Sequence, residues 1–206
     1  MNEQDLLRAA AEYYTDKLRR FGETPRGVDW NSEDAQQVRF TELLGVCAGD
    51  PMFRLNDFGC GYGALLDRLD ARCTSYTGYD VAPAMIDAAR RRYADRPGAR
   101  FTGEIGDVPR ADYSVASGIF SVKGAVDPET WLAHVHRTLD DLRDRSERGF
   151  AFNALTAYSD PDRMRPDLYY ADPHALFERC FRRYSPRVAL LHDYGLWEFT
   201  IRVRLD

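Results

Sequence analysis

The chain has 206 residues, of which 44% are hydrophobic and 30% are charged, as in an ordinary globular protein. This length suits a single α/β domain with enough residues to bury a core. The net charge of −5 and the lack of a basic block disfavour a nucleic-acid phosphate backbone as the main partner. No apolar run approaches the length of a membrane span, and the first residues lack the features of a signal peptide.

The four cysteines are scattered, without a Cys-x-x-Cys pair, which favours free thiols in a reducing cytoplasm over disulfides or a zinc site. His134 and His136 are two residues apart, so on a helix they point to different sides and cannot share a metal. We therefore expect a cytoplasmic protein with no metal, no nucleic-acid partner and no membrane partner. A monomer and a homodimer both remain open.

Two helices are predicted before the first strand. Apolar residues recur at helical spacing over residues 6–18, and a second helix is expected from a cap at Asn31 or Ser32 to about Cys47. A turn or loop at residues 24–27 separates them. We interpret residues 1–49 as a helical cap and residues 50–206 as the core of one domain.

A glycine-rich turn follows the first predicted strand, which begins at Met52. Residues 57–63 read Asp-Phe-Gly-Cys-Gly-Tyr-Gly, and helical apolar spacing begins at Ala64. Glycine allows positive φ and lets the backbone come close to a ligand that a Cβ would push away. A helix beginning just beyond such a turn presents free N–H groups. The pattern therefore predicts a nucleotide-type binding site.

A carboxylate stands about 20 residues after this turn. Asp80 ends the second predicted strand, a position from which an acid can accept both ribose hydroxyls of a nucleoside. The Gly-x-Gly-x-x-Ala spacing at residues 59–64 fits a dinucleotide such as NAD, and the Asp-x-Gly-x-Gly-x-Gly spacing at residues 57–63 fits S-adenosylmethionine. The additional glycine at Gly63 and the acid at Asp57 favour the second ligand, which has no pyrophosphate to accommodate.

From about residue 50 to the C-terminus the sequence resembles the class I S-adenosylmethionine-dependent methyltransferases. The resemblance implies a seven-stranded, doubly wound, mostly parallel Rossmann-like sheet. Further strands are predicted at 99–103, 111–117 and 149–155, with a terminal hairpin over 187–204. Such a hairpin after five βα units belongs to the methyltransferase sheet and is lacking in the dinucleotide dehydrogenases.

The resemblance also implies which residues contact the cofactor. In the stretch 103–109, Glu104 stands where aspartate is usual in the family; it would accept from the adenine amino group, with Asp107 as the substitute candidate. Ile105 would cover the adenine ring, near Met85. The cofactor-binding residues implied in this way are Asp57, Gly59, Cys60, Gly61, Gly63, Asp80, Val81, Met85, Glu104, Ile105, Ser117 and Gly118.

The substrate side is expected to come from the helical cap and from a long irregular stretch at residues 156–172, which we interpret as part of a lid. Aromatic cap residues could hold the sulfonium by cation–π attraction, and Arg39 could pair with the methionyl carboxylate. Ordinary core, anchor or surface roles fit the cap residues equally well. The substrate-binding candidates are Tyr13, Tyr14, Trp30, Phe120, Tyr169 and Tyr170.

A hydroxyl or protonated amine acceptor needs its proton removed during methyl transfer. His192 ranks first as catalytic base, because the resemblance places the terminal hairpin near the substrate entrance; Asp172, His174 and Glu198 are alternatives. A purely structural role, in which His192 lies at a strand end with its hydrogen bonds satisfied, is an equally good interpretation. We expect methyl transfer from S-adenosylmethionine to an oxygen or nitrogen of a small molecule. An NAD(P)-dependent oxidoreductase and a non-catalytic nucleoside-binding module are the alternatives.

Overall fold

The computed structural model describes residues 3–30 and 32–206. Its α-helices are α1 (Glu3–Phe21), α2 (Glu33–Leu44), α3 (Pro83–Arg92), α4 (Pro128–Asp144) and α5 (Pro173–Arg183). Its strands are β1 (Phe53–Phe58), β2 (Cys73–Tyr79), β3 (Ala99–Thr102), β4 (Ala111–Ala116), β5 (Ser146–Leu155), β6 (Arg187–Leu191) and β7 (Glu198–Arg204). Short 3-10 helices are η1 (Pro25–Val28), η2 (Gly45–Cys47), η3 (Ala64–Arg68), η4 (Ile105–Asp107) and η5 (Pro161–Arg163).

The strands form one sheet in the order β3-β2-β1-β4-β5-β7-β6. The pairs from β3 to β5 are parallel, and β7 is antiparallel to both β5 and β6. The predicted seven-stranded sheet with a C-terminal antiparallel hairpin is thus confirmed. Ligand sites of such sheets lie beyond the carboxyl ends of the parallel strands, where the strand order reverses between β1 and β4.

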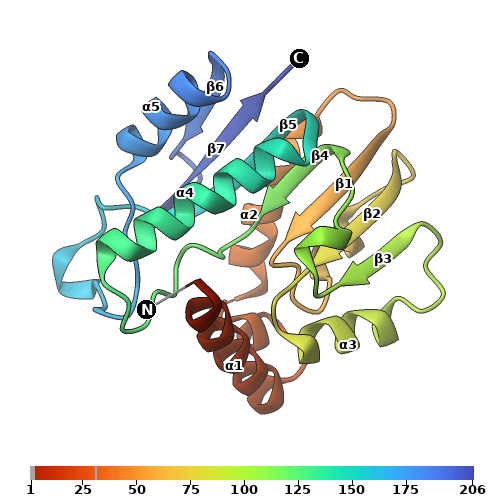
Figure 1. The fold of residues 1–206 in the computed structure, drawn as a ribbon, viewed down its shortest axis with the longest axis horizontal. Coiled ribbons are helices and arrows are strands. Elements are labelled where there is room, and N and C mark those ends of the chain that lie inside the picture. Colours follow the sequence, from red (N-terminus) through yellow and green to blue (C-terminus); the bar gives the residue numbers. More distant parts are fainter. Residues whose placement is uncertain (1–2, 31) are drawn as a thin grey trace.

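Helices cover both faces of the sheet (Figure 1). The apolar sides of α4 and α5 pack on one face around Phe150 and Phe199, and α2 and α3 pack on the other around Leu55. Helix α1 contacts α3 and η1 and lies at the end of the sheet to which the arrows of β1 and β2 point (Figure 1). It therefore covers the end of the sheet where a ligand is expected.

Side-chain caps begin α2 and α4, and the sequence predicts the cap of α2. The hydroxyl of Ser32 accepts a hydrogen bond from the N–H of Ala35 at 3.1 Å, whereas the alternative cap, Asn31, lies outside the described residues. Asp127 caps α4 in the same way, and a proline follows it at the first helical position, where the missing N–H costs nothing.

Several predicted boundaries differ from the structure. Strand β1 continues to Phe58, so Asp57 lies in the strand rather than in the turn. The segment after the glycines is the 3-10 helix η3 and not an α-helix. Residues 25–28 form η1 instead of a simple turn. No helix within the described ranges is long and apolar enough to cross a membrane.

Candidate functional site

The glycine loop after β1 depends on three left-handed backbone positions. Gly59, Gly61 and Gly63 have φ values of 73°, 55° and 86°, a region that side chains with a Cβ rarely adopt. A Cβ on Gly59 would clash with the side chain of Ile119, and one on Gly61 would lie 2.8 Å from Val28. The three glycines therefore leave the backbone of the loop accessible to a ligand that lies against it.

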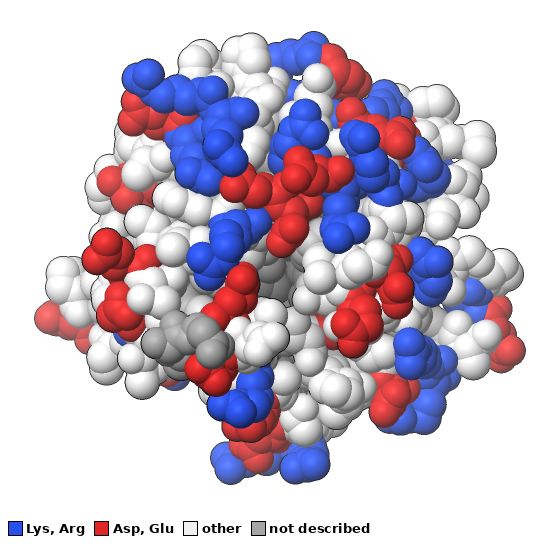
Figure 2. Space-filling model, viewed as in Figure 1, with Lys and Arg blue, Asp and Glu red and all other residues white. Residues whose placement is uncertain are grey.

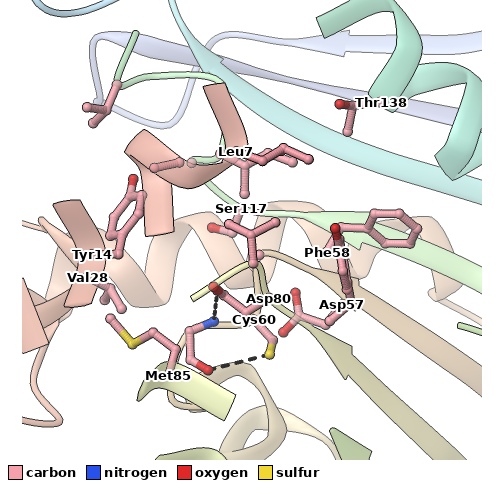
Figure 3. A pocket seen from close by; sticks show the side chains of 18 of the residues that line it. Leu7, Tyr14, Val28, Asp57, Phe58, Cys60, Asp80, Met85, Ser117 and Thr138 are labelled. Carbon is pink, nitrogen blue, oxygen red and sulfur yellow. Dashed lines mark hydrogen bonds between the residues drawn. The ribbon is translucent and has the colours of Figure 1, made fainter. Parts of the chain in front are cut away.

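Asp80 holds this loop from the neighbouring strand. Its Oδ2 atom accepts from the N–H of Gly61 at 2.9 Å (Figure 3). Its Oδ1 atom accepts from the N–H of Ala82 at 2.8 Å. Burial raises the pKa of the Asp80 carboxyl to about 6, although both backbone hydrogen bonds act to lower it. Each oxygen still has a lone pair for a further donor.

A second buried carboxyl lies beside it in β1. The Oδ2 atom of Asp57 accepts from the hydroxyl of Tyr76 at 2.7 Å. Burial raises the pKa of Asp57 to about 7; the Tyr76 hydrogen bond opposes this shift, and the charge of Asp80 adds to it. Two carboxyl groups therefore titrate close to neutral pH under the glycine loop.

The loop after β4 completes the base of the site. Gly118 has a φ of 72°, and a Cβ there would clash with the indole of Trp30. Its N–H donates to Oδ1 of Asn153 in β5 at 2.7 Å. The hydroxyl of the preceding Ser117 is buried and has no hydrogen-bond partner among the described residues. A polar atom in this state indicates a missing ligand or water.

These elements surround a cavity of about 420 Å³, within the usual size range of small-molecule sites. In Figure 3, Leu7 and Tyr14 of α1 lie on one side of it, and Cys60, Asp80 and Met85 lie on the other. The predicted site residues that line the cavity are Tyr14, Trp30, Asp57, Gly59, Cys60, Gly61, Asp80, Val81, Met85, Ile105, Ser117 and Gly118.

Other predicted cofactor residues lie around the cavity without lining it. Gly63 is buried against Tyr93 at the back of the loop, and Glu104 is exposed, next to the lining residue Ile105. The guanidinium of Arg39 lies 3.9 Å from the ring centre of Trp30 and forms an ion pair with Glu198. Their cofactor contacts stay predictions.

The predicted substrate residues outside the cavity lie in three places. The hydroxyl of Tyr13 donates to Asp29 at 2.6 Å, in the loop that leads to Trp30. Phe120 is buried in the core under α4, where its carbonyl accepts from the indole N–H of Trp131. Tyr169 and Tyr170 lie in the 156–172 stretch, half-buried. The structure thus brings only Tyr14 and Trp30 to the cavity wall.

His192 follows the carboxyl end of β6 and is exposed. Its ring stacks on Phe199, with 6.5 Å between the ring centres, and meets the edge of Tyr158 at 6.4 Å. Of the alternative bases, Asp172 caps α5, His174 lies 6.4 Å from Tyr158 and Glu198 pairs with Arg39. None of these four residues lines the cavity.

Sequence reasoning missed the part of the cavity between α1 and α4. Leu7 of α1 and His134, Thr138 and Asp141 of α4 line it. Burial lowers the pKa of His134, and its Nδ1 atom has no hydrogen-bond partner among the described residues. Helical periodicity marks such positions as core-facing but does not say that a cavity lies there. No group of three potential metal ligands occurs in the described part of the chain.

Comparisons with known proteins agree with this geometry. Residues 56–141 match the family model described as a methyltransferase domain. A protein of Mycobacterium tuberculosis, whose name gives methyltransferase as a provisional activity, is 60% identical over 162 residues, which cover 77% of this chain and 96% of that protein.

Two solved structures have the same fold. The N-methyltransferase NodS of Bradyrhizobium japonicum, in complex with S-adenosyl-L-homocysteine, matches with a TM-score of 0.68 and 16% identity over 95% of this chain and 97% of that one. The magnesium protoporphyrin IX methyltransferase of Synechocystis, with bound S-adenosylmethionine, matches with a TM-score of 0.66 and 13% identity over 97% of each chain.

Proposed function

Because the chain belongs to the class I S-adenosylmethionine-dependent methyltransferases, we propose that it methylates an oxygen or nitrogen atom of a small molecule. The observation that carries this proposal is the carboxylate of Asp80 bound to the bare glycine loop at the edge of an enclosed cavity. An acid in this place can accept hydrogen bonds from ribose hydroxyls while the loop approaches the rest of the ligand.

The residues of the cavity fit S-adenosylmethionine. Asp80 would hold the ribose, and the apolar side chains of Met85 and Ile105 would contact the adenine. The backbone at Gly59 and the unpartnered hydroxyl of Ser117 would receive the polar amino-acid part. These roles are proposals drawn from the position and chemistry of each side chain.

The cofactor, when bound, supplies a methyl group on a positively charged sulfur that a nucleophile can attack in line. The chain's own contribution is to align the acceptor and exclude water. Leu7 and Tyr14 of α1 close the cavity from above. The rings of Tyr14 and Trp30 can attract the sulfonium through their π-faces. Burial raises the pKa of Tyr14, so its hydroxyl keeps its proton at neutral pH.

Removal of the acceptor proton is the task that we propose for His192. It follows β6, whose carboxyl end lies at the same edge of the sheet as those of β4 and β5, and it is exposed to an incoming molecule. Tyr169 and Tyr170, in the stretch beside this edge, are proposed to contact the acceptor.

A small acceptor is supported by the enclosed cavity and by the surface charges. Lys and Arg side chains are interspersed with Asp and Glu on the face shown in Figure 2, without a broad basic area. Recognition of a nucleic-acid backbone needs clustered cations. We therefore propose that the acceptor enters as a free small molecule.

Titration calorimetry tests the cofactor. We expect the wild-type protein to bind S-adenosylhomocysteine, and Asp80→Ala to weaken binding by about tenfold or more, the effect of losing charged hydrogen bonds. Asp87→Ala, an exposed residue of α3, is the matched control. Full affinity of Asp80→Ala, or a protein that binds NADH and ignores S-adenosylhomocysteine, would overturn the assignment.

The size of the acceptor is tested with methyl-labelled cofactor in a cell extract. After incubation, the label should appear in the fraction that passes a 3 kDa filter. Label that is retained and released only by ribonuclease would identify an RNA acceptor instead, and label released only by protease would identify a protein.

A further inference from the structure

One end of the cavity is left free by the cofactor roles proposed above. It lies between the first two turns of α1, which contribute Glu3 and Leu7, and one side of α4, which contributes His134, Thr138 and Asp141. The three α4 residues follow one another at intervals of four and three, so they form one stripe along the helix. Figure 3 shows Leu7 and Thr138 in place. We name this part of the cavity the α1–α4 end.

The ionised side chains that line the cavity within the described residues are all acidic. Asp57 and Asp80 lie under the glycine loop, and Glu3 and Asp141 lie at the α1–α4 end. No lysine or arginine of the described ranges lines the cavity; Arg137 donates to Glu3 at 2.9 Å without belonging to the lining. A cavity lined by one sign of charge concentrates ligands of the opposite sign. The lining therefore favours a cationic ligand over an anionic one.

Asp141 has the surroundings of a carboxylate that lacks a full counter-charge. Its side chain is exposed, so it lies where the cavity opens to solvent. Partial burial raises the pKa of the Asp141 carboxyl; the charge of Arg145 opposes this shift, and that of Glu3 adds to it. A cation bound beside Asp141 would supply the missing charge.

His134 gives a second, independent indication of a ligand at this end. The residue is 9% exposed, and its Nδ1 atom has no hydrogen-bond partner among the described residues. The Oε1 atom of Glu3 lies 4.0 Å from Nδ1, beyond hydrogen-bond distance, but its charge favours the proton on Nδ1. Since Nδ1 is enclosed, the part of the ring that faces the cavity is the edge with Nε2. Its lone pair is then available to a donor on the ligand.

The state of the His134 ring also suits a cation. Burial lowers the pKa of His134, so the imidazole is neutral at neutral pH and does not repel a positive charge. An ammonium group carries three N–H donors, one of which can bind the imidazole nitrogen while the charge lies near the two carboxylates. A carboxylate or phosphate offers no such donor and would lie beside Glu3 and Asp141 without a cation from the lining.

We propose that the α1–α4 end binds an ammonium group of the methyl acceptor, which makes the acceptor a small amine. Nε2 of His134 accepts a hydrogen bond from the ammonium group, and Glu3 and Asp141 balance its charge. The side chains of Leu7 and Trp131, which line the cavity beside them, contact the carbon atoms next to the nitrogen. The ammonium group serves recognition, and the atom that faces the cofactor sulfur receives the methyl group. This proposal rests on the function proposed above and names the substrate class of the same site.

Saturation-transfer difference NMR at pH 7, on the protein loaded with S-adenosylhomocysteine, tests the proposal. Two sets of probes share a ring and differ in the group that it carries: benzylamine, benzyl alcohol and benzoate, and cyclohexylamine, cyclohexanol and cyclohexanecarboxylate. We expect the strongest ring-proton signal from an amine and no signal from the carboxylates. Asp141→Asn should weaken the amine signal about two- to fivefold, the effect of a partly exposed ion pair. His134→Phe should weaken it about fivefold, the effect of one hydrogen bond.

The matched control is Asp144→Asn, which changes an exposed acid of α4 outside the cavity lining and should retain the amine signal. Calorimetry with S-adenosylhomocysteine shows that each variant is folded and loaded. Cofactor binding without an amine signal overturns the ammonium subsite, as do carboxylate signals of equal strength or an amine signal that is unchanged in Asp141→Asn or His134→Phe.

Calorimetry also distinguishes this inference from the proposed function. Loss of cofactor affinity in Asp141→Asn or His134→Phe overturns the ammonium subsite, because the α1–α4 end would then hold part of the cofactor. Failure of the wild-type protein to bind S-adenosylhomocysteine is a separate result, and it contradicts the proposed function itself.

Discussion

Lys17 of α1 and Asp29 form an ion pair that fastens the helix above the cavity to the loop carrying Trp30. The hydroxyl of Tyr13 donates to the second carboxylate oxygen of Asp29 at 2.6 Å. Asp29 has a φ of 64°, a left-handed conformation that asparagine and aspartate tolerate better than most residues. One carboxylate thus links the helix that covers the cavity with the loop that carries Trp30 of the cavity wall.

Removing this carboxylate should loosen α1. In Asp29→Asn we expect faster amide hydrogen exchange in α1 and an affinity for S-adenosylhomocysteine lower by about three- to tenfold, because a partly buried, doubly bound carboxylate is worth about 1 kcal/mol. Hydrogen-exchange mass spectrometry and calorimetry measure the two effects. Asp16→Asn, which removes an exposed ion pair within α1, should change neither. Unchanged exchange in α1 of Asp29→Asn would show that packing alone holds the helix.

The buried carboxyls should make cofactor affinity depend on pH. Asp80 accepts ribose hydroxyls best when it is ionised, and burial raises its pKa to about 6. Affinity for S-adenosylhomocysteine should therefore rise between pH 5 and pH 7, a change that calorimetry measures. Asp80→Asn, which cannot ionise, should show a flatter profile. An equally steep rise in Asp80→Asn would assign the titration to another group.

The buried carboxyl of Asp57 should lower the stability of the fold as pH rises, whereas cofactor affinity rises over the same range. Folding raises the pKa of Asp57 from 3.8 to about 7, so between these values the folded state binds more protons than the unfolded state. Its contribution to the free energy of unfolding is therefore present below about pH 4 and is lost as pH rises to about 7. The loss is about 1 to 4 kcal/mol.

Asp57→Asn removes this contribution. In the ligand-free protein, the variant should gain stability relative to wild type as pH rises from 4 to 7, as measured by urea unfolding at each pH. Other acids also make stability depend on pH. Partial burial raises the pKa of Asp112, for example, but Arg54 holds it below its usual value. Such effects are the same in the variant and the wild type, so they cancel in the comparison. A stability difference independent of pH would mean that Asp57 stays ionised in the folded protein.

The glycine loop allows a substitution test with an internal control. Gly59→Ala introduces a Cβ at a φ of 73° and against Ile119. It should lower the free energy of unfolding by about 2 kcal/mol or more, from backbone strain and overpacking, and abolish cofactor binding. Gly124→Ala has a φ of 58° but no atom within 4 Å of the new Cβ, so it isolates the strain. Equal losses of unfolding free energy in the two variants would show that the contact with Ile119 contributes nothing to the effect.

His192 can be tested once the labelled extract yields a methylated product. His192→Gln should lower the transfer rate about 100-fold, the effect of losing a general base, and leave the affinity for S-adenosylhomocysteine unchanged. Single-turnover rates with the labelled cofactor measure this effect. A variant with the wild-type rate would move the base to another residue.

The glycine loop and its acid could be predicted because their signals are local. Glycines at alternate positions and an acid about 20 residues later specify a loop and a neighbouring strand end, and both are in place: the N–H of Gly61 binds Asp80. The terminal hairpin was equally readable, since alternation on either side of Gly195 does not depend on distant residues.

The side of the cavity between α1 and α4 could not be predicted, because its residues meet only through the fold. Leu7 and His134 are far apart in the sequence, and neither belongs to a motif, yet both line the cavity. Likewise, Asn153 interrupts an apolar run in β5, but its partner Gly118 becomes visible only when β4 and β5 are paired.

The place of β7 between β5 and β6 has a consequence for the order of assembly. Arg202 of β7 binds Glu42 of α2 across 160 residues of sequence, and such distant contacts slow folding because their loops are costly to close. The parallel strands and the glycine loop need only nearer partners. We therefore expect the crevice beside the glycine loop to form early in folding. The hairpin that carries His192, our proposed base, should become organised late, when β7 docks.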